Sequence, residues 1–163
     1  MSYVASTAMV SGNAHVCDAA QVHGNAIIEG NAKVCNNAKV RDHAWACGNA
    51  KIGGDAWITG NAWIIGNATV CDNAQVYGNA QIGCNAIVYW DAKVYGRARI
   101  TGDARVWGYA QVYDFALVDD MAVIGGHAKV RGNAWVSGHA VLEGDVTISE
   151  GLIIDVHWWR DVP

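Results

Sequence analysis

Alanine and aliphatic residues recur along this chain with a period of six. From Ala8 to Ala134 an Ala stands at every sixth position and, except at Ala44, is followed two residues later by Val or Ile, and a pair that is usually Gly, Asn or Asp separates successive units, as in GNAWIIGNATVCDNAQVYGNAQIG at residues 60–83. Counting in sixes from Val4 to Ile154, only Ala46 breaks the aliphatic series. Because an amphipathic helix places its apolar residues three and four apart, this period excludes long helices.

The period predicts a chain that forms a short strand, turns, and forms the next strand. Within A-x-[VI]-x, strand alternation directs Ala and the aliphatic residue to the interior and the two variable residues to the surface. The Gly-Asn pair then forms a corner, since Gly and Asn tolerate the positive φ of tight turns. Fixed six-residue repeats of this kind are typical of parallel β-helices.

The units VCDNAQ, VYGNAQ and IGCNAI share one order: an aliphatic residue, three variable residues, a small residue and one more variable residue. In this the chain resembles the hexapeptide-repeat proteins, over residues 3–156. The resemblance implies an all-β, single-stranded left-handed parallel β-helix, a triangular solenoid of about eight coils with three hexapeptides each and no inserted loops. The stretches GGHAKVRG and VYDFALV are similar, more narrowly, to bacterial and phage repeat proteins rich in GNA motifs.

We predict two segments, a β-helix over 1–156 and a C-terminal tail over 157–163 that folds over the last coil and caps its open edge. The chain is 52% apolar and 16% charged, which excludes intrinsic disorder. No window approaches the roughly eighteen apolar residues of a membrane span, and the opening MSYVASTAMV fits the repeat better than a signal peptide. We therefore expect a cytoplasmic protein that does not bind membranes.

Cysteine usage favours free thiols. The five cysteines are an odd number without a CxxC pair, which argues against both a disulfide framework and a zinc cage. Cys17 and Cys35 would be neighbours in one column of the solenoid, and Gly53 separates them from Cys71. We interpret these cysteines as small residues that fit a strand.

Sorting the outward residues by their place in the coil separates a basic, tyrosine-bearing face from an apolar one. The basic face has no acidic residue at a strand position, and its candidate polyanion-binding residues are Lys39, Arg41, Lys93, Lys129 and Arg131. The apolar face is larger than most monomers leave in water, which indicates a protein interface. Related hexapeptide proteins are commonly trimers, so we predict a homotrimer, with a dimer as the alternative. The candidate interface residues are Met9, Ile27, Trp45, Trp63, Ile65, Leu117, Trp135 and Ile153.

One region departs from the corner rule, because larger side chains replace the usual Asn or Asp and aromatic residues lie on the strands beside them. Departures from a local rule tend to mark functional sites. We predict that this region binds a protein partner. Its candidate residues are Tyr95, Arg97, Trp107, Tyr109, Tyr113, Phe115, Met121 and His127.

The sequence lacks the motifs of the enzymes that the resemblance suggests. Hexapeptide acyltransferases use a catalytic His and a loop inserted between hexapeptides, and gamma-class carbonic anhydrases bind zinc through a His pair five residues apart. Neither an insertion nor such a pair occurs here, and the six histidines stand singly, with His43, His127 and His139 in corner positions.

We therefore predict no catalytic residue, no metal and no cofactor, and a non-enzymatic solenoid that serves as an interaction or assembly module. Two alternatives stay open. One is a hexapeptide acyltransferase with a site between subunits. The other, less favoured, is binding of nucleic acid or another polyanion through the basic face.

Overall fold

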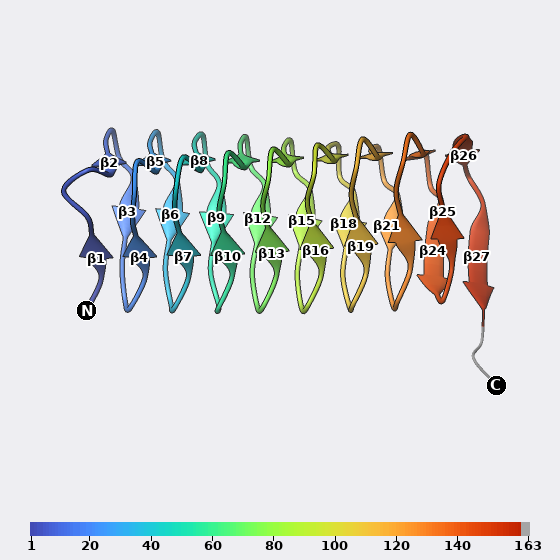
Figure 1. Ribbon diagram of the computed structural model, residues 1–163, viewed down its shortest axis with the longest axis horizontal. Coiled ribbons are helices and arrows are strands. Elements are labelled where there is room, and N and C mark those ends of the chain that lie inside the picture. Colours follow the sequence, from blue (N-terminus) through green and yellow to red (C-terminus); the bar gives the residue numbers. More distant parts are fainter. Residues whose placement is uncertain (161–163) are drawn as a thin grey trace.

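The computed structural model describes residues 1–160 as short strands stacked rung upon rung along one long axis (Figure 1). The strands form three nine-stranded sheets, which are the three sides of a triangular prism. Sheet A contains β1 (Tyr3–Val4), β4 (Gln21–Val22), β7 (Lys39–Val40), β10 (Trp57–Ile58), β13 (Gln75–Val76), β16 (Lys93–Val94), β19 (Gln111–Val112), β22 (Lys129–Val130) and β25 (Thr147–Ile148). Sheet B contains β2 (Met9–Val10), β5 (Ile27–Ile28), β8 (Trp45–Ala46), β11 (Trp63–Ile64), β14 (Gln81–Ile82), β17 (Arg99–Ile100), β20 (Leu117–Val118), β23 (Trp135–Ser137) and β26 (Leu152–Ile154). Sheet C contains β3 (His15–Val16), β6 (Lys33–Val34), β9 (Lys51–Ile52), β12 (Thr69–Val70), β15 (Ile87–Val88), β18 (Arg105–Val106), β21 (Val123–Ile124), β24 (Val141–Gly144) and β27 (His157–Arg160).

Each strand pairs in parallel with the strand one coil later in the chain. In sheet A, for example, Trp57 lies opposite Gln75, and the Trp57 N–H donates to the carbonyl of Ala74 at 2.9 Å. Three strands make one rung, and the described residues form nine rungs, one more than predicted. The predicted fold class, an all-β triangular parallel β-helix, is confirmed, and no inserted loop interrupts the repeat over 3–160.

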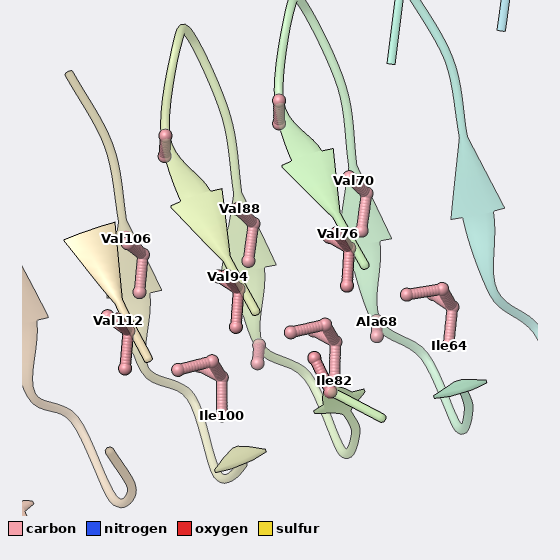
Figure 2. Close-up of a cluster of buried hydrophobic side chains, with 14 of the residues drawn as sticks. Ile64, Ala68, Val70, Val76, Ile82, Val88, Val94, Ile100, Val106 and Val112 are labelled. Atoms are coloured by element: carbon pink, nitrogen blue, oxygen red, sulfur yellow. The ribbon is translucent and has the colours of Figure 1, made fainter. Parts of the chain in front are cut away.

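The interior is made of the Ala and aliphatic columns that the repeat predicts (Figure 2). From Ala20 to Leu142 every such residue is at most 2% exposed. Identical positions stack from rung to rung, so that Ile58, Val76 and Val94 form one continuous column. Burial of these columns is the main stabilising term, because each rung alone has too few apolar contacts to fold.

The corners combine a strained backbone position with a polar ladder. The first corner residue has positive φ, and where Asp replaces Gly its carboxylate accepts a bond from the next rung, as Asp42 Oδ2 does from the Gly60 N–H at 2.9 Å. At the corner between sheets B and C, side-chain amides bond along the prism at 2.9–3.2 Å through Asn13, Asn31, Asn49, Asn67, Asn85 and Asp103. The corner acids therefore stabilise the turns.

The six-residue period fails in the last rung. Val136 pairs with Ile153 and not with Ile154, so a residue is missing between β25 and β26. Ile153 packs against the core, whereas Ile154 is 47% exposed. The assignment of Ile153 to the apolar outer face was therefore wrong, and Leu152, which lies opposite Trp135, takes that outward position.

The described part of the predicted tail continues the solenoid. β27 pairs in parallel with β24, with Trp158 in register with the buried Leu142. This strand completes the ninth rung, which is why the predicted coil count was too low. The remainder of the predicted cap, 161–163, lies outside the described residues. Nothing helical in residues 1–160 is long and apolar enough to cross a membrane.

The prediction of five free thiols was wrong for one pair. Cys17 and Cys35 lie on adjacent rungs with their Cα atoms 4.7 Å apart and form a disulfide, a link that the absence of a CxxC motif does not exclude. Cys47, Cys71 and Cys84 are free. Burial raises the pKa of the Cys47 and Cys71 thiols, with smaller contributions from Glu29 and Asp72 respectively, which lowers their reactivity.

Candidate functional site

The predicted apolar face lies on sheet B, but Gln81 and Arg99 divide it into two patches. The first patch runs over four adjacent rungs and consists of Met9, Ile27, Trp45 and Trp63, with Ile65 beside it. The second patch follows after Arg99 and consists of Leu117, Trp135 and Leu152. The structure therefore brings together the predicted interface residues other than Ile153 on one side of the prism.

The tryptophans of sheet B are held in fixed orientations. Trp45 and Trp63 meet edge to face, with ring centroids 5.1 Å apart. The indole N–H of Trp45 donates to Glu29 Oε1 at 3.0 Å, and that of Trp135 donates to Asp119 Oδ1 at 2.9 Å. Because these two indole donors are satisfied within the chain, their rings present apolar surface to the outside.

The predicted basic face lies on sheet A. Its candidate residues Lys39 and Arg41 both lie over the ring of Trp57, with the Lys39 Nζ atom 5.6 Å and the Arg41 guanidinium 5.5 Å from the ring centroid. Lys93, Lys129 and Arg131 follow towards the C-terminal end of the same sheet. The cations are thus spread along the whole face and form no single cluster.

Stacked tyrosines occupy the middle of sheet A. The rings of Tyr77, Tyr95 and Tyr113 are parallel within 3° and their centroids are 4.9 and 4.8 Å apart. Burial raises the pKa of Tyr77 and Tyr95. Because the rings cover one another's faces, the interior of this ladder offers no free ring face on which a nucleotide base could stack.

The predicted partner-binding residues separate into three places. Sheet A and the two corners beside it hold most of them, since Arg97 lies 5.5 Å from the Phe115 ring centroid and Tyr109 stacks on His127 at 5.1 Å. Trp107 lies on sheet C, edge to face with Trp90 at 5.2 Å. Met121 lies at the opposite corner, between sheets B and C, so the structure does not bring it together with the others.

A hollow that the sequence did not indicate lies at this corner between sheets B and C. It has a volume of about 350 Å³ and begins where the asparagine ladder ends at Asp103. The lining residues are Gly102, Asp103, Asp120, Met121, Gly138 and His139.

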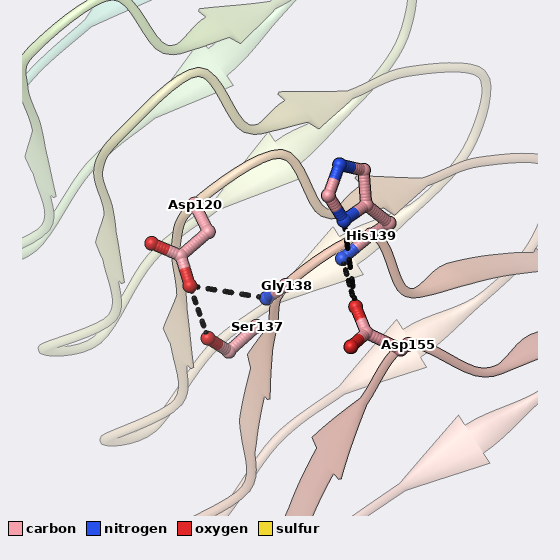
Figure 3. Close-up of polar contacts among 5 residues, drawn as sticks. All are labelled: Asp120, Ser137, Gly138, His139 and Asp155. Atoms are coloured by element: carbon pink, nitrogen blue, oxygen red, sulfur yellow. Dashed lines mark hydrogen bonds and ion pairs between the residues drawn. The ribbon is translucent and has the colours of Figure 1, made fainter.

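Two carboxylates organise the polar groups around this hollow (Figure 3). Asp120 Oδ2 accepts bonds from Ser137 Oγ at 2.6 Å and from the Gly138 N–H at 3.1 Å. The bond from Ser137, and to a smaller extent the bond from Gly138, lower the pKa of Asp120. The ionised carboxylate therefore stabilises the folded protein at pH values above its unfolded-state pKa, and this stabilisation is lost as the pH falls through the lower folded-state pKa.

His139 is paired with the second carboxylate. Its backbone N–H donates to Asp155 Oδ1 at 2.7 Å, and its Nδ1 atom lies 3.5 Å from the same oxygen. Both side chains are mostly exposed. An imidazole with a carboxylate at Nδ1 presents Nε2 as a proton acceptor. Sequence reasoning missed the pair because an unbroken period would have stacked His139 on His157, whereas the shortened last rung puts Asp155 there.

Comparison with known proteins identifies the fold. No family model matches the chain, and no curated protein matches its sequence. UDP-N-acetylglucosamine acyltransferase from Francisella novicida is similar in structure, with 18% identity and a TM-score of 0.50 over 94% of this chain and 67% of that one. The enzyme of the same name from Campylobacter jejuni gives 16% identity and a TM-score of 0.36 over 83% and 65%. The parallel β-helix of this chain is therefore a fold that it shares with the Francisella novicida acyltransferase.

Proposed function

We propose that this protein is a self-associating β-solenoid that acts as an assembly module, with sheet B as the surface between copies. The observation that supports this role is the apolar patch of Met9, Ile27, Trp45 and Trp63 on four adjacent rungs. Tryptophans that are already oriented by contacts within the chain, as Trp45 and Trp63 are, need little reordering to bind, and buried tryptophans commonly dominate interface energies. The proposed assembly is a homotrimer, with a dimer as the alternative.

The mixed aromatic and cationic surface of sheet A is the proposed site for a different protein. Arg97 with Phe115 and Tyr109 with His127 flank the tyrosine ladder on its two sides. Aromatic residues and Arg are the types enriched at protein interfaces. A bacterial or phage origin and a cytoplasmic location remain predictions.

Replacing both Trp45 and Trp63 by Glu is expected to convert the oligomer to monomers, measured by light scattering over a range of protein concentrations. Each tryptophan at the centre of an interface is worth at least about 2 kcal/mol, or roughly thirtyfold in the dissociation constant. Trp57→Glu is the matched control, because Trp57 is 44% exposed on sheet A while Trp63 is 40% exposed on sheet B. A monomeric wild-type protein, or a double variant of unchanged mass, would reject sheet B as the interface between copies.

The His139–Asp155 pair beside the hollow favours a second candidate function, acyl transfer. In this proposal His139 Nε2 accepts the proton of a hydroxyl nucleophile as its oxygen attacks the carbonyl of an acyl thioester, the thiolate leaves, and the proton passes to it. Asp155 orients the imidazole. The hollow lies at the edge of sheet B, so a second subunit packed on sheet B would lie next to it.

His139→Gln is expected to lower acyl transfer from an acyl thioester to UDP-N-acetylglucosamine by about 10²- to 10⁴-fold, measured as product by mass spectrometry. Asp155→Asn should lower it less and change its dependence on pH. His43→Gln is the control, since His43 occupies a corner elsewhere on the prism. Absence of product with the wild-type protein, or equal rates for His139→Gln and His43→Gln, would exclude this candidate.

A further inference from the structure

We propose that Cys17, Cys35 and Asp18 form a binding site for a thiophilic divalent cation such as Zn²⁺ when the Cys17–Cys35 disulfide is reduced. Among the residues that the structure describes, these three are the one group of His, Cys, Asp or Glu whose possible ligand atoms all lie close together, within 4.8 Å of one another. The site lies on the outer side of sheet C, away from the interface proposed on sheet B and from the hollow beside His139.

The sheet register holds the two sulfur atoms next to each other. Val16 lies opposite Val34 in the pairing of β3 with β6, and both valines face the interior. The residues that follow them, Cys17 and Cys35, therefore both face outwards on neighbouring rungs. The Cys17 N–H donates to the carbonyl of Val34 at 3.0 Å, so the ladder continues through this position. Reduction of the disulfide breaks one S–S bond but leaves this main-chain ladder intact.

Asp18 supplies a carboxylate to the same side of the pair. Its Oδ2 atom lies 3.9 Å from Cys17 Sγ and accepts bonds from the Asn36 N–H at 2.9 Å and from Asn36 Nδ2 at 3.4 Å. Hydrogen bonds of this kind orient a ligating carboxylate. Tetrahedral Zn²⁺ has Zn–S distances of about 2.3 Å and Zn–O distances of about 2.0–2.2 Å, so its ligands lie roughly 3.5–4 Å apart, within reach of these atoms.

The surroundings leave room for the cation and for a fourth ligand. Gly53 follows Cys35 in the same column, one rung later, and has no side chain that could cover the sulfur pair. A water molecule can complete four-coordination.

Disulfide and metal are alternative states of one sulfur pair. A phosphine with one water molecule reduces the disulfide to two thiols and becomes a phosphine oxide. The divalent cation then displaces both thiol protons to solvent as two metal–sulfur bonds form. The disulfide has no thiolate to offer, so the oxidised protein lacks these ligands.

The test compares Cd²⁺ binding by the full chain before and after reduction with tris(2-carboxyethyl)phosphine, followed by removal of the phosphine without oxygen. Thiol counting of the unfolded protein should give three thiols before reduction and five after it. The reduced protein should bind one Cd²⁺ per chain, with the ultraviolet charge-transfer band of thiolate ligation, and Zn²⁺ should displace it. The oxidised protein should show no such band.

Variants identify the ligands. Cys17→Ser and Cys35→Ser should abolish the band, and Cys71→Ser should not change it. Asp18→Asn should weaken binding by at least about tenfold, since even the outer partners of metal ligands contribute that much. Asn36 holds the same corner position one rung later with φ 61°, so Asn at position 18 is compatible with the backbone. Equal Cd²⁺ binding by reduced wild-type protein and Cys17→Ser would overturn the site, and five thiols before reduction would overturn its redox control.

Discussion

Val76→Asp is expected to unfold the rungs around β13 and most of the solenoid with them. Val76 is fully buried between Ile58 and Val94 in the aliphatic column of sheet A. A carboxylate at this position would have only Ala and aliphatic side chains around it, and an unpaired buried charge costs at least about 3–5 kcal/mol. This is a large part of the roughly 5–15 kcal/mol of a typical domain. Because each rung contacts only its neighbours, the loss of one rung removes contacts from both sides.

The measurement is thermal and urea unfolding followed by circular dichroism. Gln75→Asp is the matched control, because it introduces the same carboxylate one residue earlier on the same strand, where the side chain faces outwards. The control should melt within a few degrees of the wild-type protein. If Val76→Asp melted with the control, the inward assignment of the aliphatic column would be wrong.

Gly54→Ala is expected to destabilise the protein by at least about 2 kcal/mol, the second-largest effect of a single substitution that we predict. Gly54 has φ +64°, and a Cβ atom there would lie 2.5 Å from the backbone nitrogen of Asp72 on the next rung. Neither the unfavourable positive φ nor the clash of the new Cβ atom with Asp72 is easily relieved, since the obstructing atoms belong to the main chain of a stacked corner. The substitution forces the two rungs apart where the ladder bonds must form.

Gly53→Ala separates this effect from the general loss of a glycine. Gly53 has no positive φ, and a Cβ atom there would meet only the Asn36 side chain, at 3.2 Å. Urea unfolding of both variants should give a loss of stability for Gly54→Ala several times larger than for Gly53→Ala. Similar values for the two would contradict the close stacking of the corners.

The regular part of the molecule follows from the sequence because its physical rules are local. Strand alternation decides which of two neighbouring residues, such as Gln75 and Val76, faces the core, and the corner tolerates Gly, Asp or Asn because of the backbone conformation it requires. These rules repeat in every rung, so an error in one rung would disagree with all the others. The columns of sheet B, including Trp45 beside Trp63, could therefore be predicted without knowledge of any contact.

Assignments made from the repeat were wrong where a coil is shorter than the regular period, because one residue fewer changes which residues stack on one another. The last rung has fewer residues than the others, so Ile153 faces inwards and Asp155 lies beside His139. The strand and turn preferences of the neighbouring residues do not indicate such a shift. The disulfide is a different case, because the regular period already makes Cys17 and Cys35 neighbours in one column, and only the bond between their sulfur atoms was not predicted.

By itself, then, the sequence determined the period, the inward columns, the corners and the division of the surface into apolar and basic faces, since each of these depends on strand alternation and turn chemistry within a few residues. The tertiary structure decided how groups from different rungs meet: the bond between the neighbours Cys17 and Cys35 with Asp18 beside it, the tyrosine ladder whose rings cover one another, and His139 with Asp155 beside the hollow. Those contacts depend on the exact length of every coil and on side-chain rotamers, and both are set by the packing of one rung upon the next.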